Sequence, residues 1–155
     1  MEPPTDLIAQ PDVIMLDLTA SSREATLRAL HARLCSATDA VSDPDRFLLD
    51  LLERAMVAPV CISADVATPH ARTTAVERIV LGVARTAAPG VGFDGEHPAV
   101  RLIFMIGTPK QQVTEYLELV ATISRVLKVA GAREALLEAE SEAKFRAALS
   151  RAAAT

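Results

Sequence analysis

The sequence has 155 residues, half of them hydrophobic, and a formal net charge of −4. This length suits one domain with a substantial buried core, which we expect at residues 12–153 after a flexible N-terminal segment at 1–11. Aromatic residues make up only 3% of the chain, and Lys and Arg are not clustered. Because base stacking needs aromatic side chains and phosphate binding needs a basic surface, we expect no nucleic-acid partner.

The sequence shows no pattern typical of a signal peptide or of a membrane-spanning helix. The N-terminal residues lack the basic and apolar regions of a signal peptide, and no apolar run reaches the roughly 18 residues that a bilayer-spanning helix needs. Cys35 and Cys61 lie in apolar surroundings without CxxC spacing, which favours buried free thiols over a disulfide or a metal pair. We therefore expect a cytoplasmic protein with no direct membrane insertion.

In chain order, the first predicted element is a strand at residues 14–18, where apolar residues alternate with Met15 and Asp17. Ser21 and Glu24 have the spacing of a capping box, which starts a helix that reaches residue 35. On this helix we expect His31 at the surface. Asp43 and Pro44 open a second helix, since Asp caps free N–H groups and Pro suits the first turn. Residues 57–68 predict extended chain or short strands.

The second half of the sequence predicts two buried strands followed by helices. Residues 78–84 and 100–106 are apolar almost throughout, as in strands that are covered on both faces. Spacing then predicts a helix at 112–127, with Gly131 as its stop, and the chain closes with two short helices at 133–139 and 141–151. Buried strands with helices on both sides predict an α/β sandwich.

His70 carries the clearest chemistry in the sequence. It follows Pro69, between an apolar run and a loop of small residues. A neutral imidazole is nucleophilic near neutral pH, so it can carry a phosphoryl group without a separate base. The local sequence equally suits a partly buried histidine that is hydrogen-bonded to backbone. Nucleotide-binding glycine loops, zinc-binding histidine motifs and the serine-hydrolase elbow do not occur, so we expect no cofactor and no metal.

Several segments together match a known family. Ile-x-Leu-x-Leu stands at 14–18, Ala-Thr-Pro-His at 67–70, a Pro-Gly turn and a strand ending in Pro at 79–109, and Leu-Leu-x-Ala near the end. In these features the chain resembles the EIIA domains of the fructose/mannitol class in the bacterial phosphoenolpyruvate-dependent sugar phosphotransferase system, which include the nitrogen-regulatory EIIA proteins. The likeness runs from about residue 12 to residue 149.

The resemblance implies a fold, a reaction and partners. The fold is a mixed β-sheet between helices on both faces, and His70 is the phospho-acceptor. Phosphate would arrive from the phospho-histidine of an HPr-type carrier and pass to an EIIB protein or domain, or mark a regulatory state for a transporter or kinase. Arg54 would stabilise the phosphate and Thr68 could contact it, although a solvated helix-end arginine and a plain strand residue remain open. The oligomeric state is also open, a homodimer included.

Three departures from the family pattern bear on this chemistry. Ser63, Ala64 and Asp65 replace loop glycines, which would otherwise let backbone N–H groups approach a phosphate closely. Tyr116 replaces the family's second histidine, and its hydroxyl can donate a hydrogen bond but supplies no cation. Ala55 replaces a helix-ending Glu. The alternative function is therefore a diverged EIIA-like regulatory module that binds a partner without phosphotransfer. Arg72 and His97 are expected to be a surface charge and a loop residue.

Overall fold

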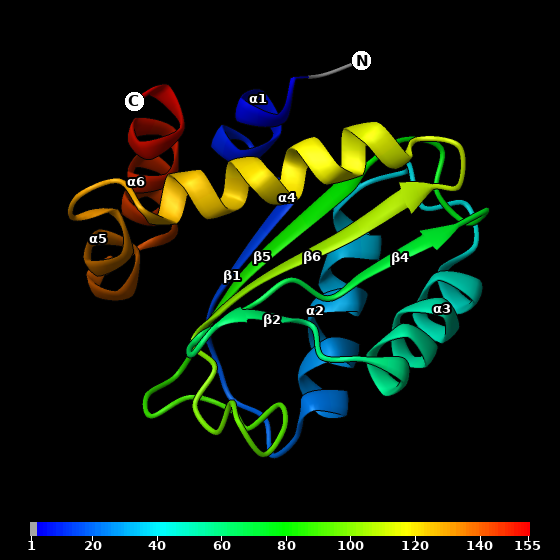
Figure 1. Ribbon diagram of the computed structural model, residues 1–155, viewed down its shortest axis with the longest axis horizontal. Helices are drawn as coiled ribbons and strands as arrows, with labels where there is room; N and C mark the ends of the chain where they lie inside the picture. The colour runs from blue at the N-terminus through cyan, green and yellow to red at the C-terminus, as the bar shows by residue number, and fades with distance from the viewer. Residues whose placement is uncertain (1–2) are drawn as a thin grey trace.

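A computed structural model describes residues 3–155 as a six-stranded mixed sheet covered by helices on both faces (Figure 1). This arrangement confirms the predicted α/β class. The elements follow one another as α1 (Pro4–Ala9), β1 (Val13–Leu18), α2 (Arg23–Ala37), α3 (Pro44–Val57), β2 (Cys61–Ser63), β3 (Val66–Ala67), β4 (His70–Thr73), β5 (Val80–Thr86), β6 (Leu102–Pro109), α4 (Val113–Leu127), α5 (Ala132–Glu138) and α6 (Glu142–Ala154).

The sheet is built around β5 and β6, an antiparallel pair whose residues are all buried. Beside them, β1 runs parallel to β5, while β3 and β4 both run parallel to β6. β3 pairs with the start of β6 and β4 with its end, in one unbroken register from Val66↔Leu102 to His70↔Ile106. Only Thr68 and Pro69 interrupt the pairing between them. The candidate histidine therefore begins the strand segment that follows this interruption.

Each face of the sheet has its own hydrophobic core. Helices α2 and α3 cover one face, where Phe47 is the largest fully buried side chain. Helices α1, α4, α5 and α6 cover the other face, where Phe104 and Phe145 are fully buried. In Figure 1, α4 crosses in front of the strands and α2 lies behind them. Burial of these large apolar side chains on both faces is the main force that holds the layers together.

The N-terminal region differs from the flexible segment expected at 1–11. Helix α1 lies within it and buries Leu7 and Ile8 against the core beside α4 and α6. The sequence contains the signals for this helix: Pro4 suits its first turn, and Asp6 lies favourably near the N-terminal end of the helix dipole. A helix of six residues is too short to show helical periodicity, which is why the pattern missed it. Residues 1 and 2 lie outside the described residues.

Two further details of α2 differ from expectation. Its N-cap is Ser22, whose hydroxyl accepts from the Ala25 N–H, and Ser21 is not the cap. His31 is buried and not at the surface, because its Nε2 donates to the Pro44 carbonyl at 2.8 Å and its ring packs on Phe47. A carbonyl only accepts, so Nε2 carries the proton. His31 thereby ties α2 to the start of α3.

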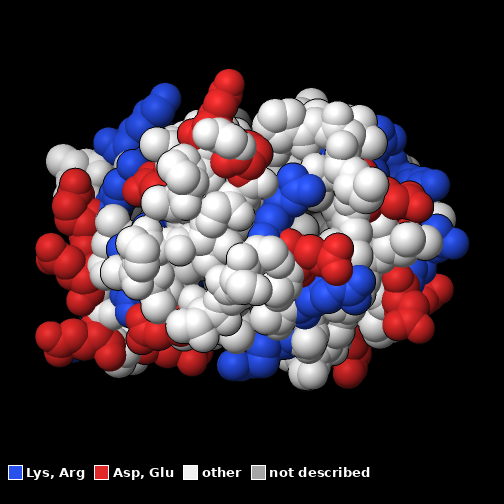
Figure 2. All heavy atoms as spheres, turned by 90° about the horizontal axis from the view of Figure 1, so that it is seen from below, with Lys and Arg blue, Asp and Glu red and all other residues white. Residues whose placement is uncertain are grey.

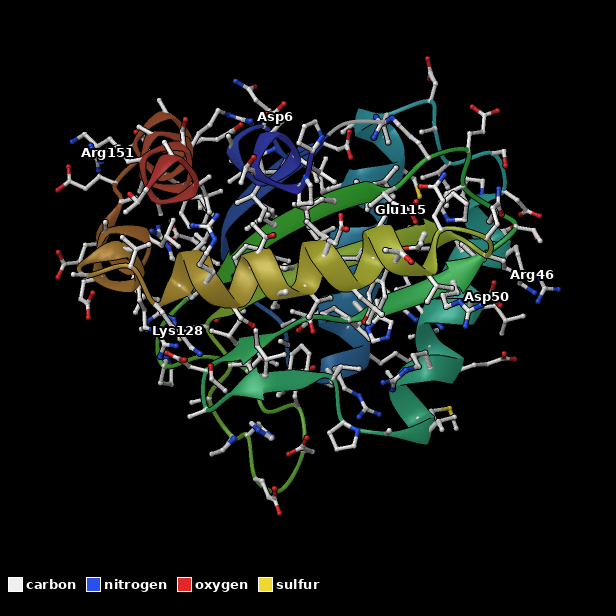
Figure 3. All side chains as sticks on the ribbon, turned by 45° about the horizontal axis from the view of Figure 1, so that its top comes forward. Asp6, Arg46, Asp50, Glu115, Lys128 and Arg151 are labelled. Carbon is white, nitrogen blue, oxygen red and sulfur yellow. The ribbon has the colours of Figure 1, made fainter. Side chains whose placement is uncertain are left out.

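Charges on the surface are mixed. On the face seen in Figure 2, basic and acidic side chains are interspersed, and acidic groups gather at the left edge, where α5 and the start of α6 lie. Figure 3 shows Arg46 and Asp50 on the outer side of α3, where they form an ion pair at 3.5 Å. Among the helices of residues 3–155, none combines the length and the hydrophobicity that crossing a membrane requires.

Gly107 on β6 lets α3 approach the sheet. A Cβ at this position would lie 2.8 Å from Phe47 Cζ and 3.0 Å from Val80 Cγ2. Both side chains are fully buried and cannot move aside easily. We expect Gly107→Ala to lower the free energy of unfolding by about 1–3 kcal/mol, measured by urea denaturation.

The matched control is Gly95→Ala, where nothing lies within 4 Å of the added methyl group. Its effect should stay within about 0.5 kcal/mol. Equal stability of the two variants would show that the α3–sheet contact is not as tight as described.

Candidate functional site

His70 lies where three elements meet. It opens β4, pairs in register with Ile106 of β6, and packs its ring against Tyr116 of α4. The end of α3, which carries Arg54, lies on another side, close enough for the arginine charge to act on the imidazole. The ring is half-buried, so it is neither walled off nor free in solvent. Segments far apart in the sequence therefore converge on one imidazole.

A hydrogen bond to the backbone fixes which nitrogen of His70 is available. Nδ1 lies 2.9 Å from the Thr68 carbonyl oxygen. Because a carbonyl oxygen can only accept, Nδ1 must carry the proton, and the neutral ring then holds its lone pair on Nε2. Nε2 has no hydrogen-bond partner among the described residues. His70 is thus the partly buried, backbone-bonded histidine that the sequence allowed, and the same bond leaves the lone pair of Nε2 free, as a nucleophile requires.

The protonation state of His70 also suits a nucleophile. Burial lowers the pKa of the imidazole, the Thr68 carbonyl acts in the opposite direction, and the positive charge of Arg54 lowers the pKa further. Since the shift is downward, the ring is neutral at neutral pH and its nucleophilic form predominates.

Tyr116 forms one wall of the site. Its ring centroid lies 4.8 Å from that of His70, with 35° between the planes. Burial raises the pKa of the phenol, and Arg54 partly offsets this. The hydroxyl consequently stays protonated and can donate a hydrogen bond to an oxyanion. The structure brings together Tyr116, Arg54 and His70, three residues that the sequence singled out.

The positive charge of Arg54 acts on the pKa of both the His70 imidazole and the Tyr116 phenol. Arg54 is half-buried in the last turn of α3, and its Nη1 donates to the Ala58 carbonyl at 3.1 Å. A guanidinium has five N–H donors, so this single bond anchors the side chain and leaves further donors for a phosphate. Because residue 55 is an alanine, it offers no carboxylate to compete for Arg54.

Thr68 and Arg72 have other partners. The Thr68 side chain is buried, and both its N–H and its hydroxyl point to the Val60 carbonyl, at 2.7 and 3.5 Å. Its own carbonyl is the group that touches His70. Arg72 is exposed and donates to the Lys110 carbonyl. Sequence reasoning missed the backbone role of Thr68, because the signal for it is the absence of an N–H on Pro69, which breaks the pairing with β6 and frees the preceding peptide.

The loop that lacks the family's glycines does not bring a negative charge to the imidazole. Asp65 forms an ion pair with Arg133 of α5 at 2.8 Å, and its backbone carbonyl accepts from the N–H groups of Arg101 and Leu102. Ser63 also lies within hydrogen-bonding distance of Arg133. These contacts hold the turn between β2 and β3 against α5 and the start of β6.

The sequence matches the family described as "Phosphoenolpyruvate-dependent sugar phosphotransferase system, EIIA 2" over residues 7–152. A curated relative from Haloferax volcanii, a "PTS system fructose-specific EIIA component", is 36% identical over 135 residues, 84% of each chain. The chain belongs to the EIIA 2 family.

Solved structures share the fold of this EIIA 2 chain. The nitrogen regulatory protein IIA-Ntr from Neisseria meningitidis superposes with a TM-score of 0.76 at 22% identity, covering 92% of this chain and 94% of that one. The mannitol enzyme IIA of Escherichia coli, in its complex with phosphorylated enzyme IIB, gives a TM-score of 0.73 at 19% identity, with 90% and 95% covered. At these identities the likeness confirms the EIIA type-2 fold expected from the sequence.

The contribution of Arg54 to the EIIA 2 site can be measured by NMR titration of His70. We expect Arg54→Gln to raise the imidazole pKa, because removing a nearby positive charge favours the imidazolium form. The pKa should still remain below its ordinary value, since burial, the larger cause, is unchanged. The control is Arg72→Gln, since Arg72 is an exposed arginine on β4, the strand of His70. This variant should leave the imidazole pKa unchanged. A lower pKa in Arg54→Gln would contradict the assignment.

Proposed function

We propose that this EIIA 2 protein is a phosphoryl carrier that accepts phosphate on Nε2 of His70. The observation that supports this most directly is the Nδ1 bond to the Thr68 carbonyl, which leaves a neutral nitrogen with a free lone pair. The donor is the phospho-histidine of an HPr-type carrier. The bond from phosphorus to the donor's nitrogen breaks as the bond to Nε2 forms, and the donor's imidazole leaves with the electron pair.

The other residues of the site stabilise the charge of the phosphoryl group and of the ring. Phosphoryl transfer needs alignment and neutralisation of the oxygens more than covalent help from the protein. Arg54 supplies the positive charge, and the Tyr116 hydroxyl donates to an oxygen from the facing wall. When Nε2 carries phosphate, the ring becomes electron-poor, and the Thr68 carbonyl stabilises the N–H on its other side.

The acceptor after His70 is an EIIB protein or domain, which takes the phosphoryl group on a cysteine or histidine. Two observations support this partner: the family of the chain, and the solved complex of the mannitol relative with its phosphorylated enzyme IIB. The Haloferax volcanii relative, which is fructose-specific, makes a fructose permease the first system to test.

An exposed apolar surface beside the site suits carrier docking. Met56 and Val57, in the same last turn of α3 as Arg54, are 79% and 81% exposed, and Leu117, next to Tyr116, is 58% exposed. Val113 precedes Leu117 by one helical turn and is also exposed. Exposed aliphatic side chains that flank a reactive group on two elements are typical of a protein contact surface. We infer that the HPr-type carrier and the EIIB partner contact these residues during transfer.

Phosphorylation of His70 has a direct test. Incubation with phosphoenolpyruvate, enzyme I and an HPr-type carrier should add about 80 Da, the mass of one phosphoryl group. The adduct should be absent in His70→Ala and present in Arg72→Gln, whose exposed charge leaves Nε2 untouched.

Circular dichroism of His70→Ala establishes that the loss is not unfolding. An adduct that persists in His70→Ala would overturn the proposal. A protein that resists labelling yet binds its partner would favour the regulatory binding module instead.

The docking surface makes a kinetic prediction. Met56→Asp places a charge in the apolar contact, so the KM for the phosphorylated carrier should rise about tenfold while kcat changes little. Ala147→Asp is the control, because Ala147 is exposed on α6, at the opposite end of the sheet from β4 (Figure 1). A fall in kcat with unchanged KM would instead place Met56 in the chemical step.

A further inference from the structure

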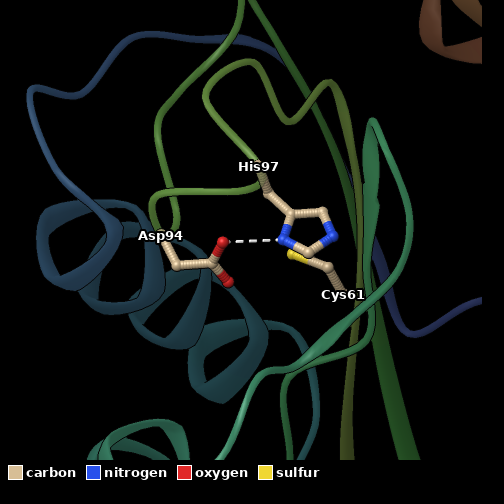
Figure 4. A group of neighbouring side chains, drawn as sticks. All are labelled: Cys61, Asp94 and His97. Carbon is tan, nitrogen blue, oxygen red and sulfur yellow. Dashed lines mark hydrogen bonds and ion pairs between the residues drawn. The ribbon is translucent and has the colours of Figure 1, made fainter.

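We propose that Cys61, Asp94 and His97 form a metal site for Zn²⁺, separate from His70. The three side chains converge from two segments of the fold (Figure 4), and one ligand atom from each lies within 4.8 Å of the other two. A thiolate, an imidazole and a carboxylate are the three ligand types that Zn²⁺ takes in proteins. No metal-binding motif announces this group in the sequence, because Cys61 lies far from Asp94 and His97 along the chain and meets them only in the fold.

The spacing of the three ligand atoms can be compared with the spacing in a tetrahedral zinc site. Zinc–ligand bonds of about 2.0–2.3 Å in tetrahedral geometry place neighbouring ligand atoms roughly 3.3–3.8 Å apart. The imidazole Nδ1 and the Asp94 carboxylate already lie 2.7 Å apart, with a proton between them. A metal that enters there replaces this proton, and the Cys61 sulfur already lies within 4.8 Å of both other ligand atoms.

The turn that carries two of the ligands is fixed by its own backbone. The Asp94 carboxylate accepts from the Glu96 N–H at 2.9 Å, and the Phe93 N–H donates to the His97 carbonyl at 2.9 Å. The side chains of His97 and Asp94 are 18% and 29% exposed, so they are sheltered but reachable. Cys61 comes from β2, which is paired with β3. Because the ligands are held before a metal arrives, little ordering entropy opposes binding.

The charges balance when Zn²⁺ binds. Cys61 loses its thiol proton to solvent and becomes a thiolate, Asp94 is already a carboxylate, and the proton on Nδ1 of His97 is exchanged for one on Nε2. The metal with two anionic ligands and one neutral ligand carries no net charge, so the nearby Arg23 does not oppose it. Water takes the fourth position, as in zinc sites with three protein ligands.

The same three residues support a catalytic role for Cys61 less well than a metal site. Burial, joined by the negative charge of Asp94 and partly offset by Arg23, raises the pKa of the Cys61 thiol to about 11. A nucleophilic cysteine needs a lowered pKa, because the thiolate is the reactive form. Without a metal, Cys61 therefore stays protonated and unreactive, whereas a bound metal supplies the charge that deprotonates it.

Cobalt titration of the full chain tests the site. The metal-free protein, reduced with a thiol-free reductant, is titrated with Co²⁺ as a spectroscopic probe for Zn²⁺. We expect one ion per chain, a thiolate-to-cobalt charge-transfer band that Zn²⁺ abolishes, and a higher melting temperature with Zn²⁺. Cys61→Ser should lose the band, and His97→Gln should weaken binding by at least about tenfold.

The matched control is Cys35→Ser. Cys35 also lies beside a histidine, with its sulfur 3.4 Å from His31 Nε2, but among the residues that the structure describes no carboxylate completes a metal-ligand group there. Its cobalt spectrum should equal that of the unmodified chain. Binding without a thiolate band, or equal affinity in His97→Gln, would overturn the proposal. Far-ultraviolet circular dichroism of each metal-free variant separates loss of a ligand from loss of the fold.

Discussion

The hydrogen bond between His70 Nδ1 and the Thr68 carbonyl is the contact on which the functional account depends. It exists because Thr68 and Pro69 interrupt the pairing of the chain with β6 while the register continues. Thr68 turns its N–H to Val60 and its carbonyl to the imidazole. One break in a sheet thus decides the tautomer of the His70 ring, and with it the nitrogen that we propose as the phosphate acceptor.

The surroundings of the ring adjust its electronic state without adding a general base. Burial and the Arg54 charge both favour the neutral imidazole, and Tyr116 presents a protonated hydroxyl from α4. In the proposed transfer, the same arginine that disfavours an imidazolium would also stabilise the phosphate on that ring, because a phosphoryl group brings negative charge to the site. Arg54 would then favour both the nucleophile before transfer and the product after it.

Much of the fold was predictable because its segments carry strong local patterns. The apolar runs of β5 and β6 and the capped starts of α3 and α6 determine elements that the structure places within three residues of expectation. His70, Arg54 and Tyr116 could be singled out by resemblance. The burial of His31 and the meeting of Cys61 with His97 depend on tertiary contacts. One-dimensional periodicity does not contain such contacts, so they could not be predicted.

The most direct test of the central claim is nitrogen NMR of His70 in uniformly ¹⁵N-labelled protein. Long-range proton–nitrogen correlations should show a protonated Nδ1 and an unprotonated Nε2 in the free protein. After phosphorylation, the coupling to phosphorus should fall on Nε2. A ring protonated on Nε2, or phosphorus coupled to Nδ1, would contradict the role given to the Thr68 carbonyl.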